Sequence, residues 1–253
     1  MNHQEWAKSL HHSARTQTPR TQFSTTEQYS LEDAYAIQHA LIAERVAEGH
    51  EVVGVKMGFT SVAKMNQMGV DDMIIGQLTS DMKISIQQPL QRSQCIHPRA
   101  EPEIAFRLSQ NVEGALSVDE IVNYVDGVAA AVEVIDSRYE NFKFSLEDVV
   151  ADNCSSCGYA MGPWREVPLE LNGLNMVQFF DGTIIAKGNS DAILGNPFEA
   201  LSAATRLAKQ HGIALKKGMI VFAGASTAAH FIKEHSKVVV KVDGLGEAPF
   251  AVV

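Results

Sequence analysis

Three glutamates in apolar segments are the residues of this sequence best suited to carry chemistry. Glu101 and Glu103 stand two apart in HPRAEPEIAFRL, residues 97–108. On a strand, this spacing points both carboxylates to the same face, where like charges repel each other. Glu133 lies in another apolar run, GVAAAVEVIDSR at 127–138. Because burying unpaired carboxylates is costly, another group must compensate their charge.

A divalent cation would neutralise the three acids and order their oxygens. A set of oxygen ligands favours Mg²⁺ or Mn²⁺ over Zn²⁺. The alternative interpretation places Glu101 and Glu103 on the solvent face of an edge strand. Arg99 and Arg107 would then be their partners.

Lys56 and Asp81 are the next candidates. Lys56 lies in EVVGVKMGFT, residues 51–60, which is apolar and β-branched and therefore predicts a strand. Its side chain would either extend to solvent or, if buried near the acids, provide a positive charge for an anionic substrate or a proton donor. Asp81, in LTSDM, would be a turn acid or the carboxylate of a lysine–carboxylate pair.

Arg138 and Asn153 are the predicted substrate-binding residues. Arg138, in IDSRYENFKF, would hold a substrate carboxylate through two hydrogen bonds, or form an exposed ion pair with Asp136 or Glu140. Asn153 follows an apolar segment in VVADNCSS, where the alternative is a simple turn.

The chain has three cysteines, too few for a disulfide framework in a protein of this length. Cys154 and Cys157 have C-x-x-C spacing, which redox and zinc sites use. Cys95 stands alone in the sequence, and no second ligand pair is visible. We therefore interpret Cys154 and Cys157 as small residues of a turn or core.

The composition indicates a globular enzyme-sized chain. Of 253 residues, 45% are hydrophobic, and 21 basic residues against 30 acidic ones give a net charge of −9. Without a basic stripe, a nucleic-acid or anionic-membrane partner is not expected. The N-terminus lacks the apolar segment of a signal peptide, and no apolar run approaches the roughly 20 residues that span a bilayer. A cytoplasmic location is the expectation.

The hydrophobic pattern predicts an α+β fold. Helices are expected at 4–14, 30–49, 61–68, 117–125 and 197–211, and strands at 51–60, 73–84, 103–109, 127–136, 174–188, 219–225 and 237–253. Strands dominate without regular βαβ alternation, which argues against a doubly wound sheet or a TIM barrel. We expect an N-terminal helical portion with the first core strand at 1–72 and a β-rich catalytic core at 73–253, integrated as one domain.

Five motifs, taken in order, resemble the fumarylacetoacetate hydrolase superfamily: VVGVKMGFTS, MGVDDMIIGQLTSDM, HPRAEPEIAFRL, AAVEVIDSRYENFKFSLEDVVADNCSS, and VFAGAST followed by GLG. The resemblance is to its branch of 2-hydroxypentadienoate hydratases and 4-oxalocrotonate decarboxylases, and it covers most of the chain from about residue 28. It implies a mixed β-roll or β-sandwich core. It also implies metal ligands at Glu101, Glu103 and Glu133, an active-site lysine at Lys56 and an active-site aspartate at Asp81.

The resemblance implies decarboxylation of 2-oxohex-3-enedioate (4-oxalocrotonate) to 2-hydroxypenta-2,4-dienoate, dependent on Mg²⁺ or Mn²⁺, in meta-cleavage degradation of aromatic compounds. VEVIDSRYENFKF is closer to the decarboxylases. The alternative is a hydratase that converts 2-hydroxypenta-2,4-dienoate to 4-hydroxy-2-oxopentanoate. A non-catalytic subunit and an acylpyruvate hydrolase are weaker alternatives. A small anionic 2-oxo acid substrate, a homo-oligomer and a complex with the partner hydratase are also implied.

Two segments depart from the pattern of these relatives. IKEHSKVVV replaces a Pro/Gly-Asp turn, and Asn196-Pro197 stands where His-Pro is frequent. Both lie away from the expected metal ligands. They therefore bear on the subgroup of the branch, decarboxylase or hydratase, and on the substrate, more than on the metal.

Overall fold

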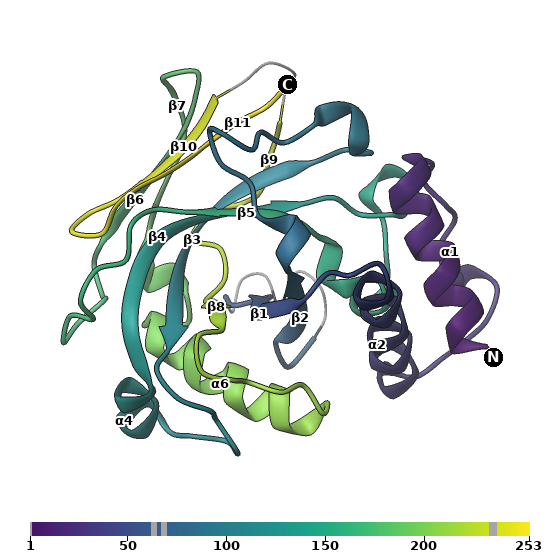
Figure 1. The fold of residues 1–253 in the computed structure, drawn as a ribbon, viewed down its shortest axis with the longest axis horizontal. Coiled ribbons are helices and arrows are strands. Elements are labelled where there is room, and N and C mark those ends of the chain that lie inside the picture. The colour runs from purple at the N-terminus through teal and green to yellow at the C-terminus, as the bar shows by residue number, and fades with distance from the viewer. Residues whose placement is uncertain (1, 62–64, 67–69, 233–236) are drawn as a thin grey trace.

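The computed structural model describes residues 2–61, 65–66, 70–232 and 237–253 (Figure 1). Within them, the chain forms helices and two β-sheets, with the helices packed against the larger sheet, and this α+β architecture confirms the predicted fold class. Most of the helix expected at 61–68 lies outside the described residues. No helix of the described chain is long and apolar enough to cross a membrane.

Two long helices form the N-terminal portion, α1 (His3–Thr16) and α2 (Leu31–Ala47), which pack against each other (Figure 1). The start of α2 is a capping box. The Asp33 amide donates to Ser30 Oγ at 3.1 Å, and the Ser30 amide donates to Asp33 Oδ2 at 3.0 Å. These two bonds satisfy amides that have no partner inside the helix.

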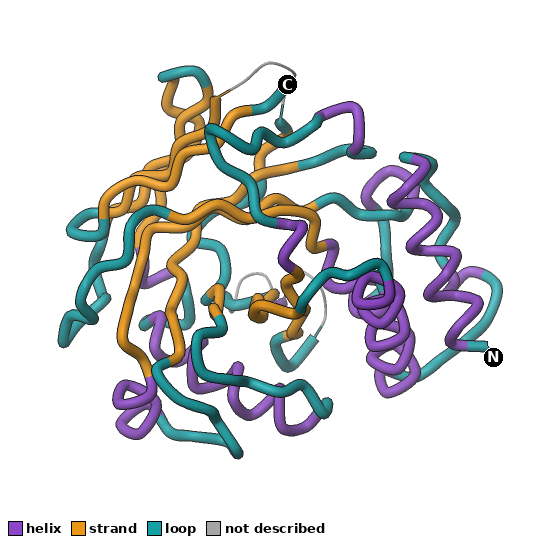
Figure 2. The backbone as a smooth tube through the Cα atoms, viewed as in Figure 1, coloured by secondary structure: helices purple, strands orange, loops and turns teal. Residues whose placement is uncertain are grey.

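The larger sheet has the order β2-β1-β8-β3-β4-β5, with β9 paired to β3. Its strands are β1 (Val52–Gly58), β2 (Ile74–Thr79), β3 (Arg99–Leu108), β4 (Val125–Ile135), β5 (Ser156–Met161), β8 (Ile220–Phe222) and β9 (His230–Phe231). Strands β1 and β8 run parallel, and the other pairs run antiparallel. The sheet curves from β1 and β2 at the centre of the molecule to β3, β4 and β5 farther out (Figures 1 and 2).

The second sheet is antiparallel, with the order β11-β10-β6-β7. Its strands are β6 (Asn175–Phe180), β7 (Thr183–Asn189), β10 (Lys237–Val242) and β11 (Gly246–Ala251). In β10, Val238, Val240 and Val242 are buried, and the residues between them are more exposed. This alternation turns one face of the sheet toward β4 and β5, which β11 contacts.

The remaining helices of the described chain are α4 (Val118–Ile121), α5 (Leu146–Ala151) and α6 (Pro197–Gln210), together with the 3-10 turns η1 (Phe23–Thr25), η2 (Ser80–Met82), η3 (Arg92–Gln94), η4 (Val122–Tyr124), η5 (Glu140–Phe142), η6 (Asn153–Ser155) and η7 (Ser190–Ala192). Helix α6 packs against β1, β2 and β8 (Figure 1). Pro197 occupies its first turn, where a missing amide hydrogen costs nothing.

Most predicted elements in the described residues are confirmed within a few positions at their ends. The strands predicted at 174–188 and 237–253 are each a hairpin of two strands, β6 with β7 and β10 with β11, and α5, β5 and β9 were not predicted. The pairing of β1 with β2 and β8 places the first core strand in the same sheet as β3 and β4. The expected division at residues 72 and 73 stays a prediction.

Candidate metal centre

The register of β3 and β4 brings the three glutamates together. Glu101 lies directly opposite Glu133, and Glu103 lies two residues farther along β3, opposite Ala131. All three side chains therefore share one face of the sheet. Each offers a carboxylate oxygen, and these oxygens lie within 4.8 Å of one another. Glu103 and Glu133 are fully buried.

The curvature of the sheet brings Lys56 to the same place. Strands β8 and β3 separate β1 from β4, so in a flat sheet the backbones of β1 and β4 would be about 14 Å apart. Lys56 Nζ nevertheless lies 3.0 Å from Glu133 Oε2. The lysine is 3% exposed, so it does not extend to solvent. Among the described residues, the inner face of the curled sheet thus brings Lys56 to the three glutamates.

Two further groups hold the glutamates in place. The Gly224 amide donates to Glu103 Oε2 at 2.8 Å, and Ser156 Oγ donates to Glu133 Oε1 at 3.2 Å. Sequence reasoning missed both groups, although the glycine-rich VFAGAST contained a signal for the first. Gly224 has a φ of +104°, and a Cβ there would lie 1.9 Å from the Oγ1 atom of Thr60. Only glycine fits this position.

The electrostatics of the cluster favour a cation. Burial and the charges of Glu133 and Glu101 raise the pKa of Glu103 well above its ordinary value. Burial opposes the charge on Lys56, but the nearby carboxylates, Glu133 first, outweigh burial and raise its pKa. Lys56 forms its ion pair with Glu133, and the two glutamates of β3 place further carboxylates beside that pair. Among the described residues, the buried Glu103 Oε1 has no hydrogen-bond partner.

These residues fit a hard divalent cation. Such ions bind carboxylate oxygens, and three oxygens within 4.8 Å of one another match the separations within one coordination shell. A bound ion would also satisfy the unpartnered oxygen of Glu103 and reduce the repulsion among the acids. The set resembles an open site, in which three protein ligands leave positions for water or substrate.

The alternative interpretation, an exposed edge strand, is wrong. Strand β3 pairs with β4 on one side and with β8 and β9 on the other. Arg107 forms an ion pair with Asp126 at 2.6 Å, and the Arg99 guanidinium lies 4.2 Å from the centre of the Phe142 ring. The two arginines therefore have other partners.

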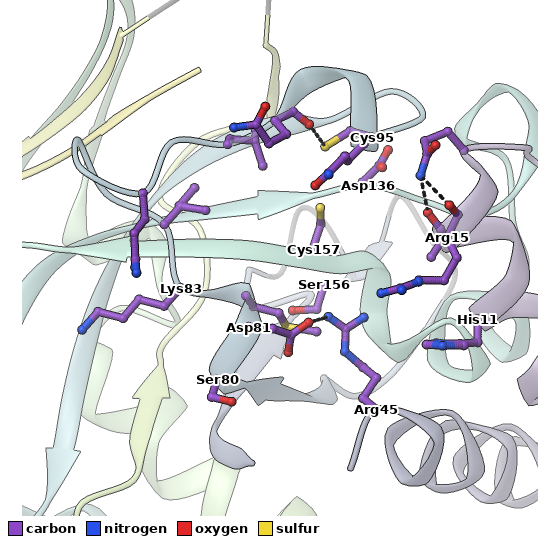
Figure 3. Close-up of a pocket in the computed structure, with 18 of the residues that line it drawn as sticks. His11, Arg15, Arg45, Ser80, Asp81, Lys83, Cys95, Asp136, Ser156 and Cys157 are labelled. Atoms are coloured by element: carbon purple, nitrogen blue, oxygen red, sulfur yellow. Dashed lines mark hydrogen bonds and ion pairs between the residues drawn. The ribbon is translucent and has the colours of Figure 1, made fainter. Parts of the chain in front are cut away.

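Asp81 lies apart from the glutamates, in η2 on the wall of a cavity of about 690 Å³ (Figure 3). Its carboxylate forms an ion pair with Arg45 and accepts a hydrogen bond from Thr79 Oγ1 at 2.6 Å. The carboxylate that pairs with Lys56 is Glu133. The structure thus corrects the alternative in which Asp81 and Lys56 would form the lysine–carboxylate pair.

Arg138 is buried and forms an ion pair with Asp152. Its Nη1 also donates to the carbonyls of Asp136 at 2.7 Å and Ser156 at 3.0 Å, and its Nη2 donates to the Asp152 carbonyl. The exposed ion pair with Asp136 or Glu140 is therefore wrong. With these internal acceptors, the guanidinium supports the chain around β5. Arg138 also lines the cavity that contains Asp81, and its role in binding a substrate carboxylate stays a prediction.

Asn153 also contacts the backbone of its own chain. Its Oδ1 accepts from the Gln77 amide at 2.8 Å, and its Nδ2 donates to the Gln77 carbonyl at 2.8 Å. The side chain thus continues the hydrogen bonding along β2. Its φ of +48° begins a run of left-handed residues that includes Cys154 and Ser155 and leads to Ser156. Asn153 therefore shapes the turn that delivers Ser156 to Glu133.

The cysteines have an unexpected arrangement. Cys154 is buried in the core, as interpreted from the sequence. Cys157 packs against the same core and lies beside Cys95, and both line the cavity that contains Asp81 (Figure 3). Cys95 is therefore not isolated in the fold, because β5 and the segment after η3 meet there.

Comparisons with known proteins agree with this architecture. No protein-family model matches the chain. The chain is 44% identical over 245 residues to 4-oxalocrotonate decarboxylase of a Pseudomonas species, covering 97% of this chain and 96% of the relative. It is 31% identical over 218 residues to 2-keto-4-pentenoate hydratase 1 of Dechloromonas aromatica, covering 85% and 83%.

Solved structures are also similar. The crystallised 4-oxalocrotonate decarboxylase of Pseudomonas putida G7, complexed with magnesium and adipate, has a TM-score of 0.93 and 29% identity, covering 99% of this chain and 97% of that one. Fumarylpyruvate hydrolase from Pseudomonas aeruginosa has a TM-score of 0.59 and 16% identity over 79% of this chain and 88% of that one, and this likeness supports the fold alone.

The curled mixed sheet with three glutamates on its inner face defines an enzyme of the fumarylacetoacetate hydrolase type. The chain belongs to the fumarylacetoacetate hydrolase superfamily, in its branch of 4-oxalocrotonate decarboxylases and 2-keto-4-pentenoate hydratases. It is an enzyme of the lyase class.

Proposed function

We propose that the chain decarboxylates 2-oxohex-3-enedioate (4-oxalocrotonate) to 2-hydroxypenta-2,4-dienoate, with Mg²⁺ held by Glu101, Glu103 and Glu133. The observation that carries the proposal is the buried cluster of three glutamates and Lys56, in a chain that aligns over 97% of its length with a decarboxylase. Mn²⁺ has the same ligand preference and is the second choice of ion.

The substrate class follows from the chemistry of the site and its relatives. A 2-oxo acid offers a carboxylate and an adjacent carbonyl oxygen, both of them hard oxygen donors suited to a divalent cation. The Pseudomonas putida G7 structure contains adipate, a diacid with six carbons like the proposed substrate. Both facts favour a small, doubly anionic 2-oxo acid.

The reaction breaks the bond between C5 and C6 and releases C6 as CO₂. The electron pair left on C5 is conjugated through the C3–C4 double bond to the C2 carbonyl, so negative charge develops on the C2 oxygen. Protonation of that oxygen gives 2-hydroxypenta-2,4-dienoate. The bound divalent cation would supply Lewis-acid stabilisation of this charge.

We assign Lys56 to stabilising the negative charge that develops on the C2 oxygen. Its Nζ is held 3.0 Å from Glu133 Oε2 and is almost without solvent, so its position and its hydrogen-bond directions are restricted. An ammonium group held in this way can orient the substrate and hold the proton that the C2 oxygen receives. Burial of Glu103 and Glu133 keeps water away from the reacting face.

The hydratase reaction is the second candidate, because the chain is also 31% identical to a 2-keto-4-pentenoate hydratase over 85% of its length. Hydration of 2-hydroxypenta-2,4-dienoate would use the same ligands and develop charge on the same oxygen. The proposal also includes association of the chain into a homo-oligomer and a complex with a partner hydratase.

The first test separates the two reactions. The purified protein is treated with a chelator, supplied with 4-oxalocrotonate and then with Mg²⁺, while CO₂ release and loss of the enone absorbance are measured. A parallel sample receives 2-hydroxypenta-2,4-dienoate. We expect CO₂ release that requires the metal. Metal-dependent consumption of the dienoate without CO₂ release from the diacid would make the protein a hydratase.

The second test addresses the metal ligands. Glu101→Gln removes one charge and should lower kcat/KM for CO₂ release by about a hundredfold or more, because several kcal/mol of stabilisation depend on the ion. The matched control is Glu113→Gln, an exposed residue outside the cluster. Full metal-dependent turnover by Glu101→Gln would contradict the three-carboxylate site.

A further inference from the structure

A second group of potential metal ligands lies outside the glutamate cluster. Sγ of Cys95, Sγ of Cys157 and a carboxylate oxygen of Asp136 lie within 4.8 Å of one another. They come from three places: the segment after η3, the end of β4, and β5. Figure 3 shows them together on the wall of the 690 Å³ cavity that all three residues line.

Backbone hydrogen bonds fix this arrangement without help from the thiols. The carboxylate of Asp136 accepts from the amides of Ile96, at 2.8 Å, and His97, at 2.7 Å. These bonds tie the segment that carries Cys95 to the end of β4. The Asp136 amide donates to the Ser155 carbonyl at 2.8 Å, which holds β4 beside the start of β5 and therefore beside Cys157.

The donor set differs in kind from the three glutamates. Two sulfurs and one carboxylate oxygen suit a soft or borderline ion such as Zn²⁺, whereas three carboxylates suit Mg²⁺. Asp136 keeps a free lone pair on each oxygen after accepting one backbone bond on each. The cavity leaves room for a fourth ligand from solvent.

The charged groups around the two thiols have both signs. The Asp136 carboxylate lies beside both sulfurs and favours a bound cation, whereas Arg92 acts on Cys95 and Arg138 acts on Cys157 with the opposite sign. The Cys157 thiol, burial and the charge of Asp136 together raise the pKa of Cys95. Cys95 Sγ donates to the Gln91 carbonyl at 3.5 Å, as a protonated thiol does. A bound cation would favour the thiolate over the thiol and so release the thiol protons.

We propose that Cys95, Cys157 and Asp136 form a second metal site, selective for a soft divalent ion of the Zn²⁺ type. The ion would join η3 to β4 and β5 on the cavity side of the sheet. Cys157 follows Ser156, whose Oγ donates to Glu133. The second ion would therefore stiffen the strand that positions one of the Mg²⁺ ligands.

The test uses Co²⁺ as a spectroscopic probe of thiolate ligation. The reduced full-length protein is freed of metal, saturated with Mg²⁺ to fill the glutamate site, and titrated anaerobically with Co²⁺. We expect one equivalent to produce sulfur-to-cobalt charge-transfer absorption and the visible bands of a tetrahedral ion, and Zn²⁺ to displace it. Cys95→Ser and Cys157→Ser should each weaken cobalt binding by about a hundredfold or more.

Two control variants define the origin of the signal. Cys154→Ser removes the third cysteine, which is outside the group, and should leave the cobalt spectrum unchanged. Glu101→Gln should also leave it unchanged, which separates the two metal sites. Because Cys157 is partly exposed, Cys157→Ser is expected to fold even if Cys95→Ser does not, and circular dichroism checks both variants.

Two results would overturn the proposal. One is the absence of charge-transfer absorption at a full equivalent of Co²⁺, or a band that both cysteine variants retain. The other is a mass spectrum of the unreduced protein that is lighter by two hydrogen atoms, with Cys95 and Cys157 in one cross-linked peptide. That second result would identify the pair as a disulfide.

Discussion

At the scale of residues, the glutamate cluster is held by backbone as much as by side chains. The Gly224 amide donates to Glu103, and the absence of a side chain lets it approach Thr60 closely. The hydrogen bond between Gly224 and Glu103 joins residues 121 positions apart in the chain. The position of the Glu103 carboxylate, a proposed metal ligand, therefore depends on a residue that has no side chain.

Gly224→Ala tests this dependence. The new Cβ would clash with Thr60 Oγ1, at 1.9 Å, and alanine is strained at a φ of +104°. We expect a loss of about 2 kcal/mol or more in the free energy of unfolding and at least about tenfold weaker Mg²⁺ binding, because Glu103 loses its fixed position. Urea unfolding and isothermal titration calorimetry measure the two effects.

The matched control is Gly218→Ala. Gly218 also has a positive φ, +85°, but a Cβ there meets nothing within 4 Å. Backbone strain alone should cost about 1 kcal/mol and leave the Mg²⁺ affinity unchanged. Equal effects of the two variants on Mg²⁺ binding would show that the Thr60 contact is unimportant.

The sequence predicted the residues of the cluster better than their supports. Glu101, Glu103 and Glu133 were recognisable because charge in an apolar strand is expensive, and Lys56 stood out for the same reason. Ser156 and Gly224 were missed, because a serine or a glycine is common in turns and its partner lies far away in sequence, although the glycine-rich VFAGAST contained a signal for Gly224. The ion pair of Arg138 with Asp152 could not be inferred before the fold placed both in the core, and the role of Arg138 toward a substrate stays a prediction.

At the scale of elements, α5 connects the N-terminal portion to the core. Asp148 in its first turn caps the helix by accepting from the Ser145 amide at 3.1 Å. The same carboxylate accepts from Ser24 Oγ at 2.5 Å and from Tyr29 OH at 2.7 Å. One buried side chain therefore anchors the segment that joins α1 to α2.

Asp148 should make stability depend on pH. Burial would raise its pKa, but the hydrogen bonds from Ser24, Tyr29 and the Ser145 amide outweigh burial and lower the pKa from its usual value. The stabilisation is present above the unfolded-state pKa, near 3.9, and is lost as the pH falls through the lower folded-state pKa. Asp148→Asn should cost about 1.5–3 kcal/mol near neutral pH and progressively less in acid.

Urea unfolding of both proteins in steps from about pH 7 to pH 3 measures this difference. Asp119→Asn is the control, because Asp119 is an exposed acid in the first turn of α4. The free energies of unfolding of Asp148→Asn and the natural protein could also differ by the same amount at every pH. That result would show that the substitution acts through packing and not through the charge of Asp148.

Elements with strong local signals were predictable. The capping boxes at Ser30 and Ser117 and the proline at 197 marked helix starts that the structure contains. Ser145 and Asp148 form the same kind of box, but α5 is six residues long and its apolar pattern is too short to show a period. Strand β5 follows three residues in the left-handed conformation. Their sequence is typical of a turn, so it did not predict the strand that begins directly after them.

At the scale of the molecule, the proposed metal site would couple ion binding to folding. Without an ion, the curled sheet must hold the carboxylates of Glu101, Glu103 and Glu133 close together, so an ion that binds only the folded state would stabilise the whole chain. With Mg²⁺ at about 100 times its Kd, the stabilisation is about 2.7 kcal/mol, which for a chain of this size corresponds to a rise in Tm of roughly 5–10 °C. Glu101→Gln should lose this rise.

Differential scanning calorimetry with Mg²⁺ and with chelator measures the shift in both proteins. K⁺ at equal ionic strength controls for general salt effects. A Tm of the natural protein that does not change between Mg²⁺ and chelator would contradict binding at the cluster. The curl itself was not predictable from the pattern of apolar residues, because that pattern identifies strands but not the order in which they pair.

The position of β8 between β1 and β3 has a consequence for how the protein is made. A ribosome synthesises β1 and β3 more than a hundred residues before β8, and until residues 220–222 emerge both strands have an unpaired edge. Gly224, which orients Glu103, emerges later still. The pairing of β3 with β4 can bring the three glutamates together early in synthesis, but the sheet that adds Lys56 and the Gly224 amide is complete only when almost the entire polypeptide is available.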